Sequence, residues 1–295
     1  MINTGKANNI KGIPQTAGKG SKLGTRIVTG LSLAGLTVFL TIWSAGAIAV
    51  EVLILSIIGV IEFYRMAERK KMRPSVFTGI CGVVLLVYFA YTGLEPHLSP
   101  LIAGLITISM LGFIFRKGFH VSSFLDVSVT VLGFLYCGWF LSYVVFIRKI
   151  PGPIHNLWGI SIEHGAGLVL MLLFSTHLTD TGAFFVGKYF GRHKLAPRIS
   201  PNKTVEGSLG GMLGAMAGAV LVGSFLGMHM EHIITIGILC GIFAQLGDLW
   251  ASILKRDVNV KDAGSVFAGH GGVLDRIDSL LFTAPIAFYF FKYFL

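Results

Sequence analysis

Charged side chains are scarce in this chain. Only 13% of its 295 residues are charged, whereas 54% are hydrophobic, and a soluble domain usually carries about 25% charged residues. The mean hydropathy is +0.76, and apolar runs of about 20 residues, which can cross a bilayer as helices, recur along the whole length. The composition argues against a soluble domain and predicts an all-α, polytopic integral membrane protein.

Cysteines and acidic residues are scarce as well. The three cysteines, Cys81, Cys137 and Cys240, lie inside apolar segments and show neither metal-ligand spacing nor a disulfide pattern. There are 14 acidic residues against 24 lysines and arginines, which gives a net charge of +10. Because cytoplasmic loops of membrane proteins are rich in Lys and Arg, we attribute the basic excess to topology and expect no nucleic-acid partner.

Nine apolar segments are candidate membrane spans. Residues 1–25 are rich in Gly, Lys and Asn and contain no apolar stretch, so we predict a disordered basic tail and not a signal peptide. The rest divides into an N-terminal transmembrane region of five spans, 26–150, and a C-terminal transmembrane region of four spans, 151–295, which contains the candidate site residues described below. The spans are expected at 27–43, 45–64, 76–92, 100–115, 125–146, 166–187, 208–226, 232–254 and 273–291.

The distribution of Lys and Arg predicts the orientation. With the N-terminus in the cytoplasm, 21 of the 24 Lys and Arg residues fall on the cytoplasmic side. The exceptions are Arg148, Lys149 and Lys292. This asymmetry predicts a multi-pass protein of the cell membrane with its C-terminus outside. The basic cytoplasmic segments are the tail with Arg26, 65–75, 116–124, 188–207, and 255–272 with Arg276.

Four aspartates lie in or at the start of the candidate spans, where charge is costly: Asp180, Asp248, Asp275 and Asp278. At a rise of about 1.5 Å per residue, all four lie within roughly 12 Å of the cytoplasmic ends of their helices. Gathered carboxylates repel one another and need a cation, for which Mg²⁺ is suited. Structural ion pairs with Lys or Arg are the alternative. A purely structural role is expected for three isolated acidic residues, Glu51, Glu62 and Asp126.

Two basic loops accompany these aspartates. The first contains Ser200-Pro-Asn-Lys-Thr204, which we interpret as a turn leading into a helix N-terminus, where free backbone N–H groups bind anions. The second is the stretch Ser252–Asp278, whose Gly269-His-Gly-Gly272 turn allows the backbone to approach a ligand closely. Together the loops favour a polyphosphate site. Its expected basic residues are Lys203, Lys255, Arg256, Lys261 and Arg276.

The second loop resembles a family signature. Ser252-Ile-Leu-Lys-Arg256, Lys261-Asp262, Gly269-His-Gly-Gly272 and Asp275-Arg-Ile-Asp278 are similar in type and spacing to the signature of phosphatidate cytidylyltransferases, also called CDP-diacylglycerol synthases. A second similar region is Ser200–Gly207 with the segment that begins at Asp180. The resemblance is strong from about residue 165 onward and rests on hydropathy alone before it. Two departures, Ala268 for the usual Pro and Phe184 for a common Tyr, remove no charged group.

The resemblance implies a reaction at the cytoplasmic membrane face, in which CTP and phosphatidate give CDP-diacylglycerol and pyrophosphate, carried out by a homodimer. It implies Asp248 and Asp275 as the Mg²⁺ ligands, with Asp278 and Asp180 supporting them or holding a second cation. Lys255 and Lys261 are assigned with these aspartates to the catalytic set. The expected substrate-binding residues are Ser200, Lys203, Thr204, Glu206, Arg256, Gly269, His270, Gly271, Gly272 and Arg276.

Other functions stay open at this point. A CTP-dependent lipid kinase or a CDP-archaeol-type synthase would use the same kind of site. An ion-coupled transporter would also bury aspartates, but it should place them near the bilayer midplane, whereas these cluster toward one face. A CDP-alcohol phosphotransferase motif begins with Asp-Gly, and no such dipeptide occurs in the chain.

Overall fold

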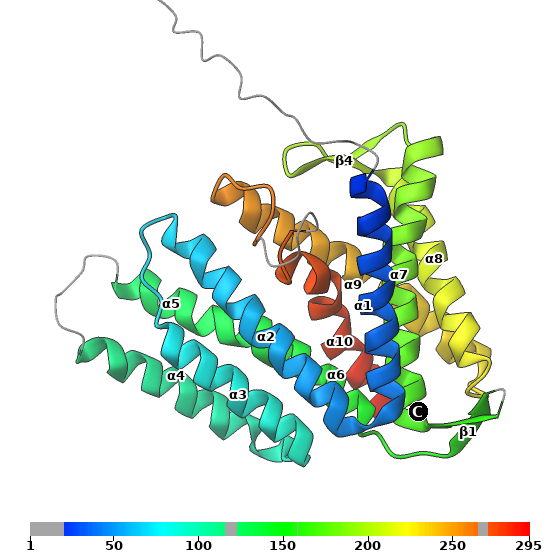
Figure 1. The fold of residues 1–295 in the computed structure, drawn as a ribbon, viewed down its shortest axis with the longest axis horizontal. Coiled ribbons are helices and arrows are strands. Elements are labelled where there is room, and N and C mark those ends of the chain that lie inside the picture. Colours follow the sequence, from blue (N-terminus) through cyan, green and yellow to red (C-terminus); the bar gives the residue numbers. More distant parts are fainter. Residues whose placement is uncertain (1–20, 116–122, 158, 265–270) are drawn as a thin grey trace, which may run out of the picture.

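The computed structural model describes residues 21–115, 123–157, 159–264 and 271–295. Within these ranges six helical segments are long and apolar enough to cross a membrane, so the prediction of an all-α polytopic membrane protein is confirmed (Figure 1). The helices are α1 (Ser21–Trp43), α2 (Ala45–Glu68), α3 (Val76–Thr92), η1 (Glu95–His97), α4 (Leu98–Ile114), α5 (Ser123–Gly133), η2 (Phe134–Trp139), α6 (Phe140–Arg148), α7 (His164–Phe190), α8 (Val205–Gly223), α9 (Met230–Asp257) and α10 (Leu274–Phe294).

The helix ends follow local signals in the sequence. The Ser44 hydroxyl caps α2 by accepting a hydrogen bond from the amide of Ala47 at 3.0 Å, and Gly93 ends α3 in the left-handed conformation at φ 75°. Helix α1 begins at Ser21, so the last five residues of the predicted tail are helical instead of disordered. Residues 1–20 lie outside the described ranges.

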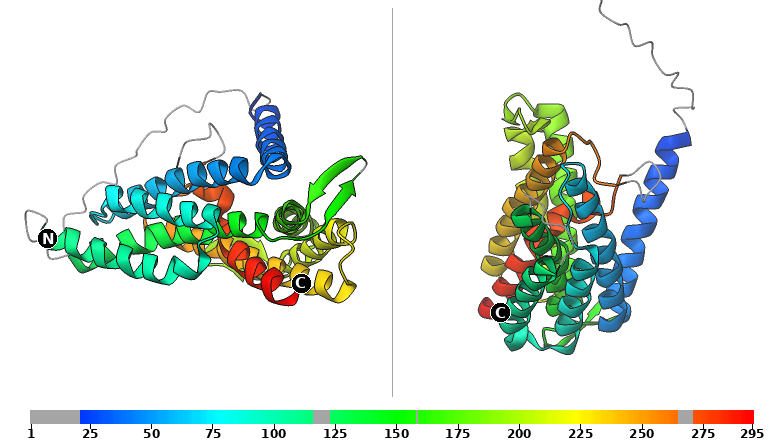
Figure 2. Two further views of the ribbon diagram at one scale, coloured as in Figure 1. Left: turned by 90° about the horizontal axis from the view of Figure 1, so that it is seen from below. Right: turned by 90° about the vertical axis from the view of Figure 1, so that its left-hand side faces the viewer.

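Helices from the two halves of the sequence share one core. Helix α7 packs against α8, α9 and α10, while α2 and α6 contact α10 from the other side. Figures 1 and 2 show α1 along the outside of this bundle. Helices α5 and α6 are joined without a break by η2, a π-helical turn, and this segment is the most buried of the candidate spans. The buried side chains of α6 and α7 therefore form the centre of the core.

Glycines let α7 and α8 approach closely. A Cβ atom at Gly182 would collide with the carbonyl oxygen of Gly210, and one at Gly214 would collide with that of Leu178. Small residues at such positions are the usual basis of tight helix packing in membranes. The extensive contact between α7 and α8 thus depends on the absence of side chains on both helices.

Two short antiparallel hairpins lie at opposite ends of the bundle and were not expected from the sequence. Strands β1 (Ile154–Leu157) and β2 (Ile160–Glu163) pair ahead of α7, and β3 (Lys194–Ala196) pairs with β4 (Ser200–Thr204) ahead of α8. The predicted turn at Ser200–Thr204 is therefore a strand that runs directly into a helix. Thr204 caps that helix, since its hydroxyl accepts from the Gly207 amide at 3.1 Å.

The basic residues that did not fit the predicted orientation have partners within the protein. Arg148 is 2% exposed, donates to the carbonyl of Thr41 at 2.8 Å and pairs with Glu163 at 2.7 Å. Lys149 donates to the carbonyl of Tyr91. Lys292, near the end of α10, pairs with Glu95 of η1 at 2.6 Å. All three cations bind carbonyl or carboxylate oxygens of the protein itself, so their position does not argue against the predicted orientation.

We expect Gly214→Ala to lower the free energy of unfolding by about 1–3 kcal/mol, because the added methyl group overpacks the contact between α7 and α8. The control is Gly104→Ala on α4, where a Cβ atom meets nothing within 4 Å. Thermal unfolding of the purified protein in detergent would measure both. Equal midpoints for the two variants would contradict this account of the helix contact.

Candidate functional site

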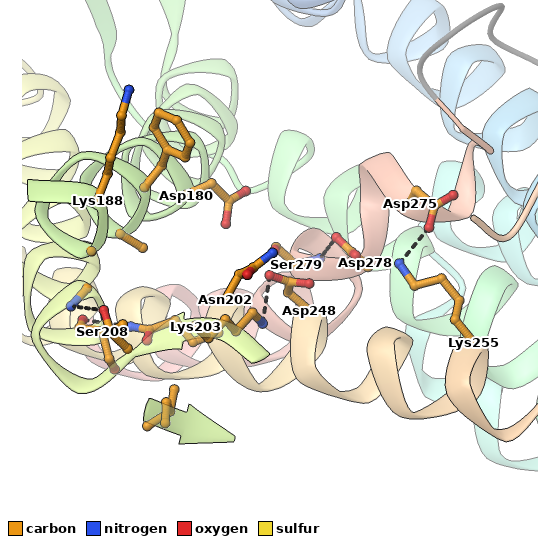
Figure 3. Close-up of a pocket in the computed structure, with 17 residues that line it drawn as sticks. Asp180, Lys188, Asn202, Lys203, Ser208, Asp248, Lys255, Asp275, Asp278 and Ser279 are labelled. Carbon is orange, nitrogen blue, oxygen red and sulfur yellow. Dashed lines mark hydrogen bonds and ion pairs between the residues drawn. The ribbon is translucent and has the colours of Figure 1, made fainter. Parts of the chain in front are cut away.

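A cavity of about 580 Å³ lies among the ends of α7, α8, α9 and α10 and the β3–β4 hairpin (Figure 3). Acidic and basic side chains face each other across it, and its wall on α7 is partly apolar. Its lining residues are Asp180, Ala183, Phe184, Gly187, Lys188, Leu195, Asn202, Lys203, Thr204, Gly207, Ser208, Gln245, Asp248, Lys255, Asp275, Asp278 and Ser279.

The four aspartates predicted from the sequence all line this cavity, although they come from three helices. Asp180 is on α7, Asp248 on α9, and Asp275 and Asp278 on α10. A close approach of α9 and α10 brings two of them together, because a Cβ atom at Gly247 would collide with the carbonyl oxygen of Asp278. Asp248 consequently interacts electrostatically with both Asp180 and Asp278.

Two lysines neutralise part of this negative charge. Lys203 of β4 lies 2.7 Å from a carboxylate oxygen of Asp248. Lys255 of α9 lies 2.7 Å from Asp275, and both of these side chains are largely buried, at 14% and 11% exposed. Asp248 and Asp275 thus each form an ion pair, and the partner lysines are themselves predicted site residues.

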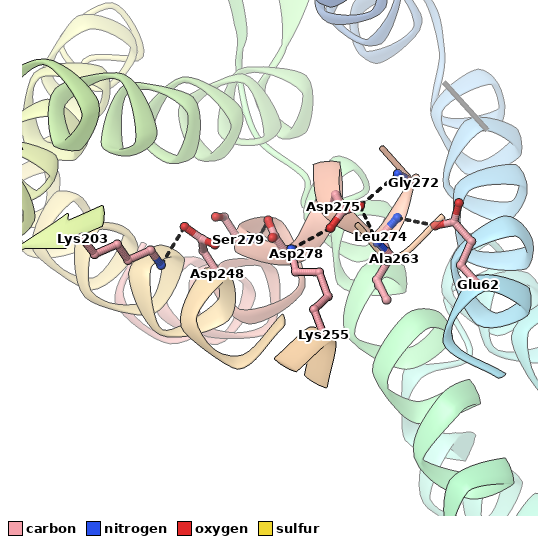
Figure 4. A network of polar contacts seen from close by, with 10 residues as sticks. All are labelled: Glu62, Lys203, Asp248, Lys255, Ala263, Gly272, Leu274, Asp275, Asp278 and Ser279. Carbon is pink, nitrogen blue, oxygen red and sulfur yellow. Dashed lines mark hydrogen bonds and ion pairs between the residues drawn. The ribbon is translucent and has the colours of Figure 1, made fainter. Parts of the chain in front are cut away.

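Asp275 also holds the loop before α10 in place. Its Oδ2 accepts hydrogen bonds from the amides of Ala263 at 2.8 Å and Gly272 at 2.9 Å, while its Oδ1 accepts from Lys255 (Figure 4). Gly271 adopts a positive φ of 84° in this turn, a conformation that favours glycine. The carboxylate therefore links α9, the loop and the first turn of α10.

Several predicted site residues do not line the cavity. Glu206 is turned toward the hairpin, where it accepts from the Arg192 amide at 3.0 Å and contacts the His193 ring at 2.6 Å. Arg256 is exposed and donates to the carbonyl of Ile199.

The other predicted substrate-binding residues differ in position. Thr204 lines the cavity, but its hydroxyl also serves as a helix cap. Ser200, Lys261 and Arg276, with Gly271 and Gly272, are outside the lining residues. Gly269 and His270 lie outside the described ranges.

The sequence analysis missed five polar residues of the cavity. Asn202 lies inside the recognised Ser200–Gly207 stretch, where it was given no role, Ser208 follows that stretch, and Gln245 precedes Asp248 by one helical turn. Ser279 follows Asp278, and Lys188 had been counted only as a topological charge. An amide such as Gln245 inside an apolar span is a signal that could have been used, because polar groups within membranes are rare.

The donor set is compatible with a divalent cation bound together with a phosphate. Among the described residues, no three His, Cys, Asp or Glu side chains are close enough together to hold a metal ion. Asp248 of α9 and both Asp275 and Asp278 of α10 nevertheless line one cavity from adjoining helices. Mg²⁺ commonly takes only one or two carboxylates and completes its coordination with water and substrate phosphates. The residues present fit that mode of binding.

Fold and cavity together define a class, an integral membrane protein with a pocket of paired lysines and aspartates at one end of its helix bundle. Residues 24–294 match the model of the cytidylyltransferase family. The chain belongs to this family, so the resemblance seen in the sequence is confirmed.

Curated relatives agree with this assignment. A phosphatidate cytidylyltransferase of Synechocystis sp. is 35% identical over 89% of this chain and 93% of its own length. That of Bacillus subtilis is 32% identical over 90% and 96%. That of Staphylococcus aureus (strain COL) is 31% identical over 88% and 96%.

We expect Lys255→Met to destabilise the protein by roughly 1–3 kcal/mol, because it leaves the buried Asp275 carboxylate without its cation. Lys70→Met is the matched control. Lys70 pairs with Asp257 at the surface, with exposures of 37% and 57%, and such pairs contribute less than about 1 kcal/mol. Thermal unfolding in detergent compares the two, and an equal loss in both would contradict a special role for the buried pair.

Proposed function

We propose that the protein is a phosphatidate cytidylyltransferase, which converts CTP and phosphatidate to CDP-diacylglycerol and pyrophosphate in phospholipid biosynthesis. The observation that supports this most is the pairing of Lys203 with Asp248 and of Lys255 with Asp275 within one cavity of a cytidylyltransferase-family protein. Lysines suit the substrate phosphates, and aspartates suit the accompanying cation.

In the proposed reaction a phosphate oxygen of phosphatidate attacks the α-phosphorus of CTP. The new bond is a phosphorus–oxygen bond, and the bond from the α-phosphorus to the oxygen that bridges it to the β-phosphorus breaks. Pyrophosphate leaves with the electron pair. The attacking oxygen is already anionic, so no general base is needed, and the protein contributes mainly position and charge neutralisation.

The ion pairs of the cavity suggest how the substrates are held. When the triphosphate enters, Lys203 and Lys255 can turn from Asp248 and Asp275 toward phosphate oxygens, which frees the carboxylates. Asp248 and Asp275 would then hold Mg²⁺, with Asp278 and Asp180 beside them, and no carboxylate is left without a cation. Bound Mg²⁺ would neutralise charge that develops on the phosphates. Lys188 supplies a further cation at the rim of the cavity.

The wall of the cavity on α7 suits a lipid substrate. Phe184 lines the cavity, and Phe184 and Phe185 are exposed, at 61% and 52%. If this exposed apolar surface of α7 faces the bilayer, as we propose, Phe184 provides a route by which the phosphate of a membrane lipid reaches the cavity. We place this end of the bundle at the cytoplasmic face, because the basic loops belong to it.

The proposed reaction predicts pyrophosphate release by the purified protein with phosphatidate, CTP and Mg²⁺. Asp248→Asn and Asp275→Asn should each lower the rate at least about 100-fold, because each removes a carboxylate that would hold the cation on the phosphates. Asp257→Asn, which alters an exposed carboxylate on the same helix as Asp248, should retain activity. Formation of CDP and no pyrophosphate would indicate a lipid kinase, and turnover only with an archaeal-type ether lipid would indicate a CDP-archaeol-type synthase. No turnover by folded protein would overturn the proposal.

Removal of divalent cations is a second test. A chelator should abolish pyrophosphate release, and added Mg²⁺ should restore it. Without a divalent cation, the lysines of the proposed site do not neutralise the combined negative charge of the aspartates and the triphosphate. Unchanged activity in the chelator would show that lysines alone neutralise the phosphates.

A further inference from the structure

Glu62 is a buried acidic residue of the N-terminal half of the chain, whereas all the residues that line the cavity lie between Asp180 and Ser279. It is on α2, is 2% exposed, and its Oε2 accepts a hydrogen bond from the amide of Leu274 at 2.9 Å across 212 residues (Figure 4). Leu274 is the first residue of α10, the helix that carries Asp275 and Asp278.

The start of α10 lacks a cap of its own. The residue before the helix is Val273, and it makes no side-chain capping hydrogen bond. The first amides of a helix need acceptors, and a carboxylate is favoured there by the helix dipole. Glu62 supplies this acceptor from another helix.

Two glycines before α10, Gly264 and Gly272, approach the same carboxyl group closely. A Cβ atom at Gly264 would collide with Oε1 of Glu62, and one at Gly272 would collide with Oε2. The amide of Gly272 in turn donates to Asp275 at 2.9 Å. Gly272 therefore approaches the Glu62 carboxyl group closely and also donates to Asp275, so one residue lies between the two side chains.

We propose that Glu62 is a positioning residue for the aspartates of α10. By capping α10 and packing against Gly264 and Gly272, it fixes where Asp275 and Asp278 stand relative to Asp248 and Lys255. The expected effect on catalysis rests on the proposed function, whereas the contact between Glu62 and the start of α10 does not. This proposal goes beyond the structural role that the sequence predicts for Glu62.

The test compares Glu62→Gln with Glu51→Gln in the full-length protein in detergent. Glu51 is a matched control, because it is a partly buried glutamate on the same helix that bonds to Thr37 at 2.6 Å, away from α10. Glu62→Gln keeps the shape of the side chain and removes its charge. Mutation of residues that orient metal ligands typically lowers metal affinity or activity 10- to 100-fold. We therefore expect kcat to fall at least about tenfold, with the KM for phosphatidate within about twofold of wild type.

Two further measurements guard against simple misfolding. Gly264→Ala approaches the same contact from the loop and should lower kcat in the same way. Combined with Glu62→Gln, it should lower kcat by less than the product of the two single effects, because both variants disturb one contact. Glu62→Ala removes the acceptor altogether. The rate of amide hydrogen exchange over residues 271–280 should rise about tenfold in this variant, as expected for the loss of one hydrogen bond. It should stay unchanged in Glu51→Gln.

The outcomes separate the two proposals. Normal kcat in Glu62→Gln, an equal loss in Glu51→Gln, or unchanged exchange in Glu62→Ala would each overturn the positioning role. If the wild-type protein shows no cytidylyl transfer but Glu62→Ala still loosens residues 271–280, the contact stands and the proposed reaction fails.

Discussion

The site depends on placing several carboxyl groups inside an apolar helix bundle. An unpaired charge in such surroundings is very costly, so each carboxylate must be matched by cations or by backbone amides. Asp248 has Lys203, Asp275 has Lys255 and two amides, and Glu62 has the amide of Leu274. The positions of the loop and of the first turn of α10 follow from these pairings.

The pocket can hold so much charge because its parts come from segments that approach very closely. Gly247 brings α9 onto α10, and Gly182 and Gly214 bring α7 onto α8. The β3–β4 hairpin then carries Lys203 across to Asp248. In this arrangement the glycines determine the distances, and the charged side chains determine the chemistry.

Much of this could be predicted from the sequence. Long apolar runs identify the helices, since hydropathy and length suffice for that. The depth of Asp180, Asp248, Asp275 and Asp278 along their helices predicts that they lie at one level, and in the structure all four line one cavity. The two hairpins could not be foreseen, because strands of three to five residues leave no period to detect. Arg256 and Lys261 have the right charge and neighbourhood, but only tertiary packing determines that Lys255, and not they, faces the cavity. The contact of Glu62 with Leu274 spans 212 residues and has no local signature.

Helix α10 is held at both ends by the first third of the chain. Glu62 of α2 binds its first residue, and Glu95 of η1 pairs with Lys292 near its last. A rod fixed at two points cannot slide along its axis or tilt without breaking one attachment. The helix that carries half of the aspartates of the cavity is therefore attached at its start to α2 and near its end to η1, so α10 can move only if one of these contacts breaks or if α2 and η1 move with it.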